Sequence, residues 1–263
     1  MNKHSSKRTL IVGNWKMNMN VHASSLLVHR LDRHIKPHRD VEVVLAPSLL
    51  AIQPISLEID RRKFRLASQD GYYRDEGAFT GEVSFTMLKE LVHYSIIGHS
   101  ERRIYFDESL DTIRDKVQAA VRNDIAPLLC VGETQQERAA GETNRVIHDQ
   151  VTTALSNLTA DEVGKVVIAY EPVWAISTFG GEIAKPDDIR PIIEHIREHV
   201  AELYGQKIAK EFRVLYGGSV KPDTVGSYLG LEGCDGALVG GASLNYKQFS
   251  AIVDSAHRIK HQE

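Results

Sequence analysis

The chain has 263 residues, of which 42% are hydrophobic and 25% charged, with a net charge of −3 and two cysteines. This composition is typical of a soluble globular protein, and the small net charge excludes a global electrostatic attraction to nucleic acid or to an anionic membrane. Two cysteines are too few for a disulfide framework, which favours a reduced, cytoplasmic setting.

The N-terminal segment MNKHSSKR is basic, and the apolar run that follows it is too short and too soon interrupted for a signal peptide. No apolar stretch is long enough to span a bilayer. The sequence also contains no linker, charge block or low-complexity stretch. We therefore predict a single domain over residues 1–263, in which residues 1–8 form a flexible N-terminal extension.

Eight short apolar runs rich in β-branched residues recur along the chain. Most are continuously apolar, which is expected of parallel strands that are covered on both faces. The runs are residues 9–14, 41–47, 64–70, 94–100, 126–132, 165–171, 212–218 and 235–241.

The segments between these runs are predicted to be helices. Apolar residues recur at helical spacing over residues 146–158 and again over 189–203. Thr134 and Glu137 have the spacing of a capping box, and Pro186 occupies the place of a first helical residue. Regular alternation of strands and helices is typical of an α/β protein with a parallel sheet and right-handed crossovers.

Eight strand–helix units in about 250 residues fit a closed, eight-stranded parallel β/α barrel. A doubly wound open sheet is the alternative. That fold would be expected to carry a glycine-rich dinucleotide-binding turn after its first strand. The segment found there, GNWKMN (13–18), is not such a turn, so we favour the barrel.

The ends of the predicted strands carry polar residues where a barrel enzyme holds its catalytic groups. Asn14 and Lys16 follow the first run, His99 ends the fourth and Glu171 ends the sixth. Taken singly, each has a structural explanation, as a solvated lysine, a helix cap or a loop residue. Cys130 alone is best explained as a small buried hydrophobic residue. The structural explanations weaken when a lysine, a histidine and a glutamate converge on one axis.

Together these side chains can move a proton on the carbon next to a carbonyl group. Glu171 would abstract the proton, His99 would polarise the carbonyl oxygen and Lys16 would offset the charge of the enediolate. His99 precedes a predicted helix start, which favours its neutral form. Glycines after the last two strands would bring backbone N–H groups to a phosphate. The sequence contains no metal-ligand spacing, and the chemistry requires no metal or cofactor.

The motifs that carry these residues resemble the signature segments of the triosephosphate isomerase family, in order and over nearly the whole chain. The matching segments are GNWKMN, GAFTGE, IIGHSERR, CVGE, YEPVWAI, LYGGSVKP and DGALVGGASL. The resemblance implies a TIM barrel and an isomerase of glyceraldehyde 3-phosphate and dihydroxyacetone phosphate, an enzyme of glycolysis and gluconeogenesis. Glu171 as base and His99 as neutral electrophile correspond to the established pattern for this enzyme.

The resemblance also assigns roles to further residues. Asn14 and Lys16 would contact the substrate, Glu101 would support Lys16, and Cys130 would pack near the base. The segment after Glu171 would form a closing lid. A loop from Gln69 to Glu82 would dock into a second subunit of a homodimer, where Thr80 would approach the partner's active site. The residues expected at the substrate phosphate are Ser177, Ser219, Gly240 and Gly241.

The lid departs from the family pattern. Over residues 175–186 the chain reads AISTFGGEIAKP, with Ser177 in place of the first lid glycine and Phe179 in place of another. A changed lid can alter closure, the hold on the phosphate or the length of substrate accepted. An isomerase of a longer ketose phosphate, such as an erythrulose phosphate, is therefore the alternative function. A barrel that binds phosphorylated ligands without catalysis is disfavoured, because no catalytic group is missing.

Overall fold

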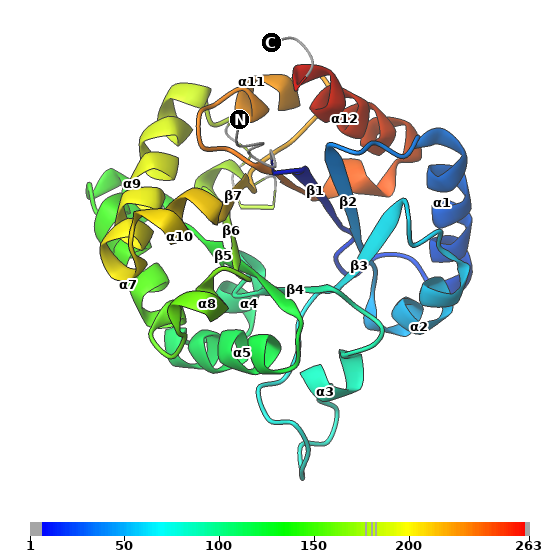
Figure 1. Ribbon diagram of the computed structural model, residues 1–263, viewed down its shortest axis with the longest axis horizontal. Coiled ribbons are helices and arrows are strands. Elements are labelled where there is room, and N and C mark those ends of the chain that lie inside the picture. Colours follow the sequence, from blue (N-terminus) through cyan, green and yellow to red (C-terminus); the bar gives the residue numbers. More distant parts are fainter. Residues whose placement is uncertain (1–6, 177, 180, 182, 261–263) are drawn as a thin grey trace, which may run out of the picture.

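A computed structural model describes residues 7–176, 178–179, 181 and 183–260 of the chain. Its centre is a closed barrel of eight parallel strands in sequential order, surrounded by helices (Figure 1). The predicted barrel is thus confirmed. The strands are β1 Thr9–Asn14, β2 Val41–Ala46, β3 Phe64–Ser68, β4 Tyr94–Ile97, β5 Ala126–Val131, β6 Val167–Tyr170, β7 Arg213–Tyr216 and β8 Gly236–Val239.

Helices connect the strands and cover the outside of the barrel. The longer ones are α1 Val21–His34, α2 Leu49–Glu58, α5 Leu110–Arg122, α7 Thr143–Leu155, α9 Pro186–Tyr204 and α12 Tyr246–Ile259. The shorter ones are α3 Phe85–Leu88, α4 Ser100–Tyr105, α6 Gln135–Ala139, α8 Ala160–Val163, α10 Gln206–Glu211 and α11 Val225–Leu229, with 3-10 turns η1 Val173–Ala175 and η2 Gly241–Leu244. The capping box at Thr134 and the helix start at Pro186 are both present.

Most strands end one to three residues before the apolar runs do. His99, for example, lies beyond β4 because Gly98 takes a positive φ of 71° and turns the chain out of the sheet. The residues left over at the strand ends include Glu171 and Gly240, whose side chain and amide were predicted to line a site.

Two apolar layers hold the barrel together, and the alternation of side chains along each strand separates them. In β1, Leu10 and Val12 point into the barrel, whereas Ile11 packs outward against the helices. Leu128 and Cys130 of β5 belong to the inner layer. The interior is therefore a packed core, and polar side chains occur at its two ends.

The amino-terminal end of the barrel is closed by a buried polar network. The Tyr94 hydroxyl donates to Glu42 Oε1 at 2.9 Å, and Arg213 lies 3.3 Å from the other carboxylate oxygen. Arg8 pairs with Glu42 at 3.0 Å, and Lys7 donates to the Phe212 carbonyl at 2.8 Å. The last two residues of the expected N-terminal extension thus contact the barrel floor, while residues 1–6 lie outside the described residues.

In the part of the chain that the structure describes, no helix is long and apolar enough to cross a membrane.

Candidate active site

The turn after β1 is held in one conformation by polar contacts on both of its sides. Lys16 has a φ of 51°, in the left-handed region that non-glycine residues seldom adopt. Its amide donates to Asn14 Oδ1 at 2.9 Å, and its carbonyl accepts from Gln69 Nε2 at 2.8 Å. Gln69 also donates to the Ala46 carbonyl at 2.9 Å. Strain held in this way is typical of functional positions.

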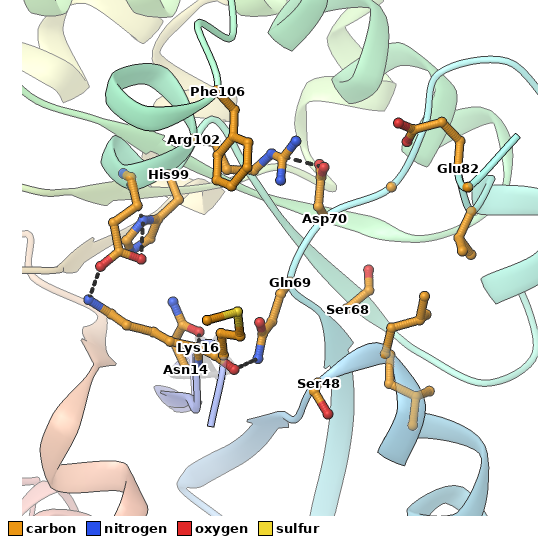
Figure 2. Close-up of a pocket in the computed structure, with 17 residues that line it drawn as sticks. Asn14, Lys16, Ser48, Ser68, Gln69, Asp70, Glu82, His99, Arg102 and Phe106 are labelled. Carbon is orange, nitrogen blue, oxygen red and sulfur yellow. Dashed lines mark hydrogen bonds and ion pairs between the residues drawn. The ribbon is translucent and has the colours of Figure 1, made fainter. Parts of the chain in front are cut away.

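The Lys16 side chain reaches across the barrel mouth to the carboxylate of Glu101. Lys16 Nζ lies 2.6 Å from Glu101 Oε1, and each side chain is about three-quarters buried. Figure 2 shows Lys16, Asn14 and His99 facing the same cavity. A fixed ammonium group is therefore available at this end of the barrel, with one carboxylate to balance it.

His99 caps the N-terminus of α4 through its ring, and this contact fixes the proton on the other nitrogen. The Glu101 amide donates to His99 Nδ1 at 3.2 Å. Because a backbone amide can only donate, Nδ1 must carry a lone pair, so the proton of the imidazole is on Nε2. His99 Nε2 lies 3.1 Å from Glu171 Oε1. The geometry therefore holds His99 as a neutral donor.

Glu171 directly follows β6 and is almost fully buried. Besides the contact with His99, its Oε2 accepts from the Ser100 amide at 3.1 Å. Ser100 is the first residue of α4, so the carboxylate lies at the positive end of that short helix. Glu171 and His99 thus share one hydrogen-bonded unit, as expected of an acid–base pair.

Glycines and a small thiol leave the room that Glu171 occupies. A Cβ at Gly132 would lie 1.7 Å from the Glu171 carbonyl oxygen, and one at Gly217 would lie 2.8 Å from Glu171 Cγ. Cys130 packs beside them, where burial and then the charge of Glu171 raise the pKa of its thiol well above the ordinary value. Cys130 is therefore a neutral packing group, not a nucleophile.

A cavity of about 190 Å³ brings the predicted residues together at the C-terminal ends of the strands. Gly240 lies beside Lys16, with 3.7 Å between an added Cβ and Lys16 Cε, and Gly241 faces open space. Gly241 also begins the 3-10 turn η2, whose first amides have no partner within the turn. The lining residues include Asn14, Lys16, His99, Glu171, Ser219, Gly240 and Gly241.

Ser219 is engaged with the start of the lid. Its hydroxyl donates to the Ala175 carbonyl at 2.7 Å, which ties the turn after β7 to the segment after β6. At the far end of the lid, the Tyr228 hydroxyl donates to the Ala184 carbonyl at 2.7 Å. Both hinges of the lid are thereby anchored to the barrel. Ser177, predicted at the phosphate, lies outside the described residues.

The lid tip contacts α4, the helix whose N-terminus carries His99 and Ser100. The Thr178 hydroxyl lies 3.4 Å from Glu101 Oε1, the same oxygen that holds Lys16. The Phe179 ring packs on Tyr105, with 5.7 Å between ring centroids. The unusual aromatic residue of this lid thus has a specific partner on the barrel.

Glu133 is a supporting residue for which the sequence analysis gave no role. It is fully buried after β5 and accepts from Trp174 Nε1 at 2.8 Å and from the Tyr170 hydroxyl at 3.1 Å. Its backbone carbonyl accepts from the Val173 amide. Burial raises the pKa of the Glu133 carboxyl above its ordinary range. A glutamate that follows a strand near a tryptophan-containing turn was the available sequence signal.

A second cavity, of about 360 Å³, opens beside Lys16 and His99 (Figure 2). It is bordered by exposed apolar side chains, among them Met17 with 96% and Phe106 with 65% of the surface accessible. The loop between β3 and α3 projects away from the barrel in Figure 1. Thr80 lies on this loop, is exposed and is not among the lining residues of either cavity.

Comparison with known proteins places this geometry in a family. A sequence model of the family described as triosephosphate isomerase matches residues 9–256. This chain belongs to the triosephosphate isomerase family. Relatives named triosephosphate isomerase include the Clostridium tetani protein, 43% identical over 94% of this chain and 96% of the relative, and the Pediococcus pentosaceus protein, 42% identical over 93% and 97%. A relative from Clostridium botulinum strain Okra is 41% identical over 94% and 99%.

Proposed function

We propose that this chain is a triosephosphate isomerase that interconverts glyceraldehyde 3-phosphate and dihydroxyacetone phosphate, without a cofactor. The observation that carries the proposal is the pairing of Glu171 with neutral His99, 3.1 Å apart, in a cavity that also contains the ammonium group of Lys16. Membership of the triosephosphate isomerase family supports the same reaction.

In the proposed reaction, Glu171 removes a proton from the carbon next to the carbonyl group. The electron pair of the broken C–H bond forms the enediolate, whose oxygen accepts a hydrogen bond from His99 Nε2 and is stabilised by Lys16. Glu171 then returns the proton to the neighbouring carbon. Asn14 positions the substrate, and the amides at Gly240 and Gly241, with Ser219 and Ser177, bind the phosphate.

Replacing the base tests this mechanism. We expect Glu171→Gln to lower kcat by about 10²- to 10⁴-fold with a folded barrel, because the amide cannot accept the proton. The exposed Glu232→Gln is the matched control and should keep wild-type activity. Measurement of kcat and of solvent hydrogen exchange into the substrate separates proton abstraction from later steps. Full activity in Glu171→Gln would remove Glu171 as the base.

The relatives favour a triose phosphate over a longer ketose phosphate as the substrate, because all three relatives described above are named triosephosphate isomerase. A side-by-side assay decides the point. We expect kcat/KM for glyceraldehyde 3-phosphate of about 10⁷ to 10⁸ M⁻¹s⁻¹, near the diffusional limit. A higher kcat/KM for a tetrose phosphate would reassign the substrate and make the altered lid its cause.

A homodimer completes the proposal. The projecting loop of residues 69–82, the adjacent cavity and the exposed Met17 and Phe106 together offer a protruding element and a receiving apolar surface. In a symmetric pair each loop would enter the partner's cavity, and Thr80 would approach the partner's Lys16 region.

The reduced thiols Cys130 and Cys234 support a cytoplasmic location, which fractionation of the source cells would test.

The dimer is tested by its mass in solution. We expect light scattering to give twice the chain mass for the wild type. Met17→Asp should shift the mass to that of a monomer, because it places a charge in the contact. Leu203→Asp, an exposed apolar residue of α9, is the control and should remain dimeric. A monomeric wild type at micromolar concentration would contradict the proposal.

A further inference from the structure

A third cavity, of about 260 Å³, lies at the amino-terminal end of the barrel, opposite the candidate active site. It is formed by the ends of loops that lead into β1, β2 and β3. Pockets for drug-sized ligands start at about 300 Å³, so this one suits a smaller molecule. Glu42, which belongs to the polar network with Tyr94 and Arg213 at this end of the barrel, lines the cavity.

Positive charge dominates the lining. A chain whose net charge is −3 places six lysine or arginine residues around this cavity, against a single carboxylate, Glu42. The six cations are Arg8, Lys36, Arg61, Arg62, Lys63 and Arg65.

The nearby carboxylates balance only part of this charge. Glu42 forms ion pairs with both Arg8 and Arg213, so its single negative charge does not also balance the other lining cations. Asp32 holds Lys63 at 2.8 Å, and Asp60 holds Arg62 at 3.0 Å. Within the described residues, the structure gives no acidic partner to the remaining lining cations, Lys36, Arg61 and Arg65.

Two histidines, His93 and His38, lie close to these cations. Arg65 Nη1 contacts His93 Nε2 at 2.6 Å, and His93 Nδ1 is buried without a hydrogen-bond partner. Burial, then the charges of Arg65 and Arg61, lower the pKa of His93 below its ordinary value. His38 itself lines the cavity; burial and the charge of His257 lower its pKa, and Lys36 acts in the same direction.

The acidic groups beside His38 are Asp40 and Asp254, the latter from α12. Asp40 binds His257 at 2.9 Å, and Asp254 Oδ1 lies 3.9 Å from His38 Nε2. These carboxylates raise the pKa of His38 and so oppose the cations there, but neither lines the cavity. Lys36, Arg61 and Arg65 are therefore the lining cations whose charge is least balanced by nearby carboxylates.

We propose that this cavity is a binding site for a small multivalent phosphate anion of pyrophosphate type, distinct from the substrate phosphate site. Guanidinium groups bind phosphate oxygens in bidentate geometry, and Arg61 and Arg65 supply two of them next to the ammonium group of Lys36. The bound anion would offset the repulsion among these cations and thereby stabilise the barrel floor.

Pyrophosphate itself is the probe, measured by two methods that see different sites. Calorimetry at constant ionic strength counts every bound anion, whereas inhibition of isomerisation reports only the anion at the active site. We expect two sites per chain by calorimetry. In the double variant Lys36→Glu/Arg61→Glu, binding at one of them should weaken about tenfold or more, while the inhibition constant and kcat stay at wild-type values.

The control variant Arg190→Glu/Lys207→Glu makes the same change in net charge on exposed positions of α9 and α10, and should keep both sites. Arg61→Gln, which removes one charge without reversing it, serves if the double variant does not fold. A single calorimetric site in the wild type, or equal weakening in the control variant, would overturn the proposal. Because calorimetry needs no turnover, loss of one site in Lys36→Glu/Arg61→Glu but not in the control variant can be measured whether or not the chain is an isomerase.

Discussion

Glu133 places a carboxyl group inside the protein between β5 and the hinge of the lid. Tyr170 and Trp174 donate to it, and the Arg138 guanidinium lies 3.9 Å away and over the Trp174 ring. The hydrogen bonds hold the lid hinge at a fixed place relative to Glu171, which begins the same segment. Glu133 thus fixes the start of the segment that carries Glu171 and leads into the lid.

Removal of the indole donor tests this role. We expect Trp174→Phe to lower the free energy of unfolding by about 1–3 kcal/mol, because it removes the shorter of the two hydrogen bonds that the buried Glu133 Oε1 accepts, from Trp174 Nε1 at 2.8 Å and from the Tyr170 hydroxyl at 3.2 Å. We also expect kcat to fall, since the hinge loses its fixed point. Urea unfolding and steady-state kinetics measure the two effects. Ile183→Ala, an exposed lid substitution, is the control; equal effects from both variants would argue against a specific role for Trp174.

The buried carboxyl also predicts a pH dependence. Its pKa is above the ordinary value of 4.5, so between that value and the folded-state pKa the folded protein binds more protons than the unfolded chain. The contribution of Glu133 to stability is therefore present below pH 4.5 and is lost as the pH rises through the folded-state pKa. In Glu133→Gln this loss should disappear from the curve of unfolding free energy against pH. A curve parallel to that of the wild type would contradict the expectation.

The residues that meet in the cavity could be predicted from the sequence more readily than the residues that support them. Lys16, His99 and Glu171 could be found because each is a polar residue at the end of an apolar run, and parallel strands bring such ends together. The contact of Glu133 with Trp174 could not be found in this way. It depends on how the turn after β6 folds back over β5, which no local pattern specifies.

Among the elements, the lid is one for which the sequence analysis predicts a departure from the family pattern. Its two hinges are fixed by Ser219 and Tyr228, and its tip packs Phe179 on Tyr105. A ring–ring contact of this kind contributes about 0.5–1.5 kcal/mol beyond simple burial. The aromatic residue at this position therefore favours the lid conformation in which the tip rests on α4.

This contact predicts slower opening of the lid. We expect Phe179→Ala to increase the dissociation rate of a transition-state analogue by about 2- to 10-fold, the equivalent of the lost ring contact. Tyr105→Ala should have the same effect, and the double variant should add little, because both substitutions remove one interaction. Stopped-flow displacement measures the rates. Fully additive effects would show that the two rings act independently.

The number and order of the strands were predicted correctly, but most strands were predicted to end one to three residues further along the chain than they do. An apolar run reports burial, and the residues just beyond a barrel strand are as buried as those within it. Gly98 illustrates the difference, because its positive φ ends the strand while its surroundings remain apolar. The position of a turn depends on a dihedral angle that composition alone does not give.

At the scale of the whole molecule, closure depends on the contact between the first and last strands. Leu10 of β1 pairs with Gly236 of β8, and a Cβ at Gly236 would lie 1.9 Å from the Leu10 carbonyl oxygen. Gly236 also has a φ of 158°. The ring of strands can therefore close only if this position has no side chain. We propose that the chain with its barrel closed folds and unfolds as one domain.

A single methyl group should thus open the barrel. We expect Gly236→Ala to lower the free energy of unfolding by more than about 4 kcal/mol, because backbone atoms must move to admit the Cβ. Gly226→Ala in α11 is the control: its Cβ would meet only Ile259 Cδ1 at 3.7 Å, so it should be neutral or slightly stabilising. Denaturant unfolding followed by circular dichroism compares them. A stable Gly236→Ala protein would disprove the steric argument.

The pairing of β1 with β8 also determines when the site comes into existence during synthesis. The Ser243 hydroxyl reaches the Asn14 carbonyl at 3.3 Å although the two residues are 229 positions apart in the chain. A nascent chain contains Lys16 almost from the start of its synthesis. It cannot form the phosphate pocket until β8 and η2 have left the ribosome. Activity should therefore appear in one step at the end of translation. A ribosome stalled before residue 236 should hold a chain that has Asn14, Lys16, His99 and Glu171 but no completed cavity and no activity.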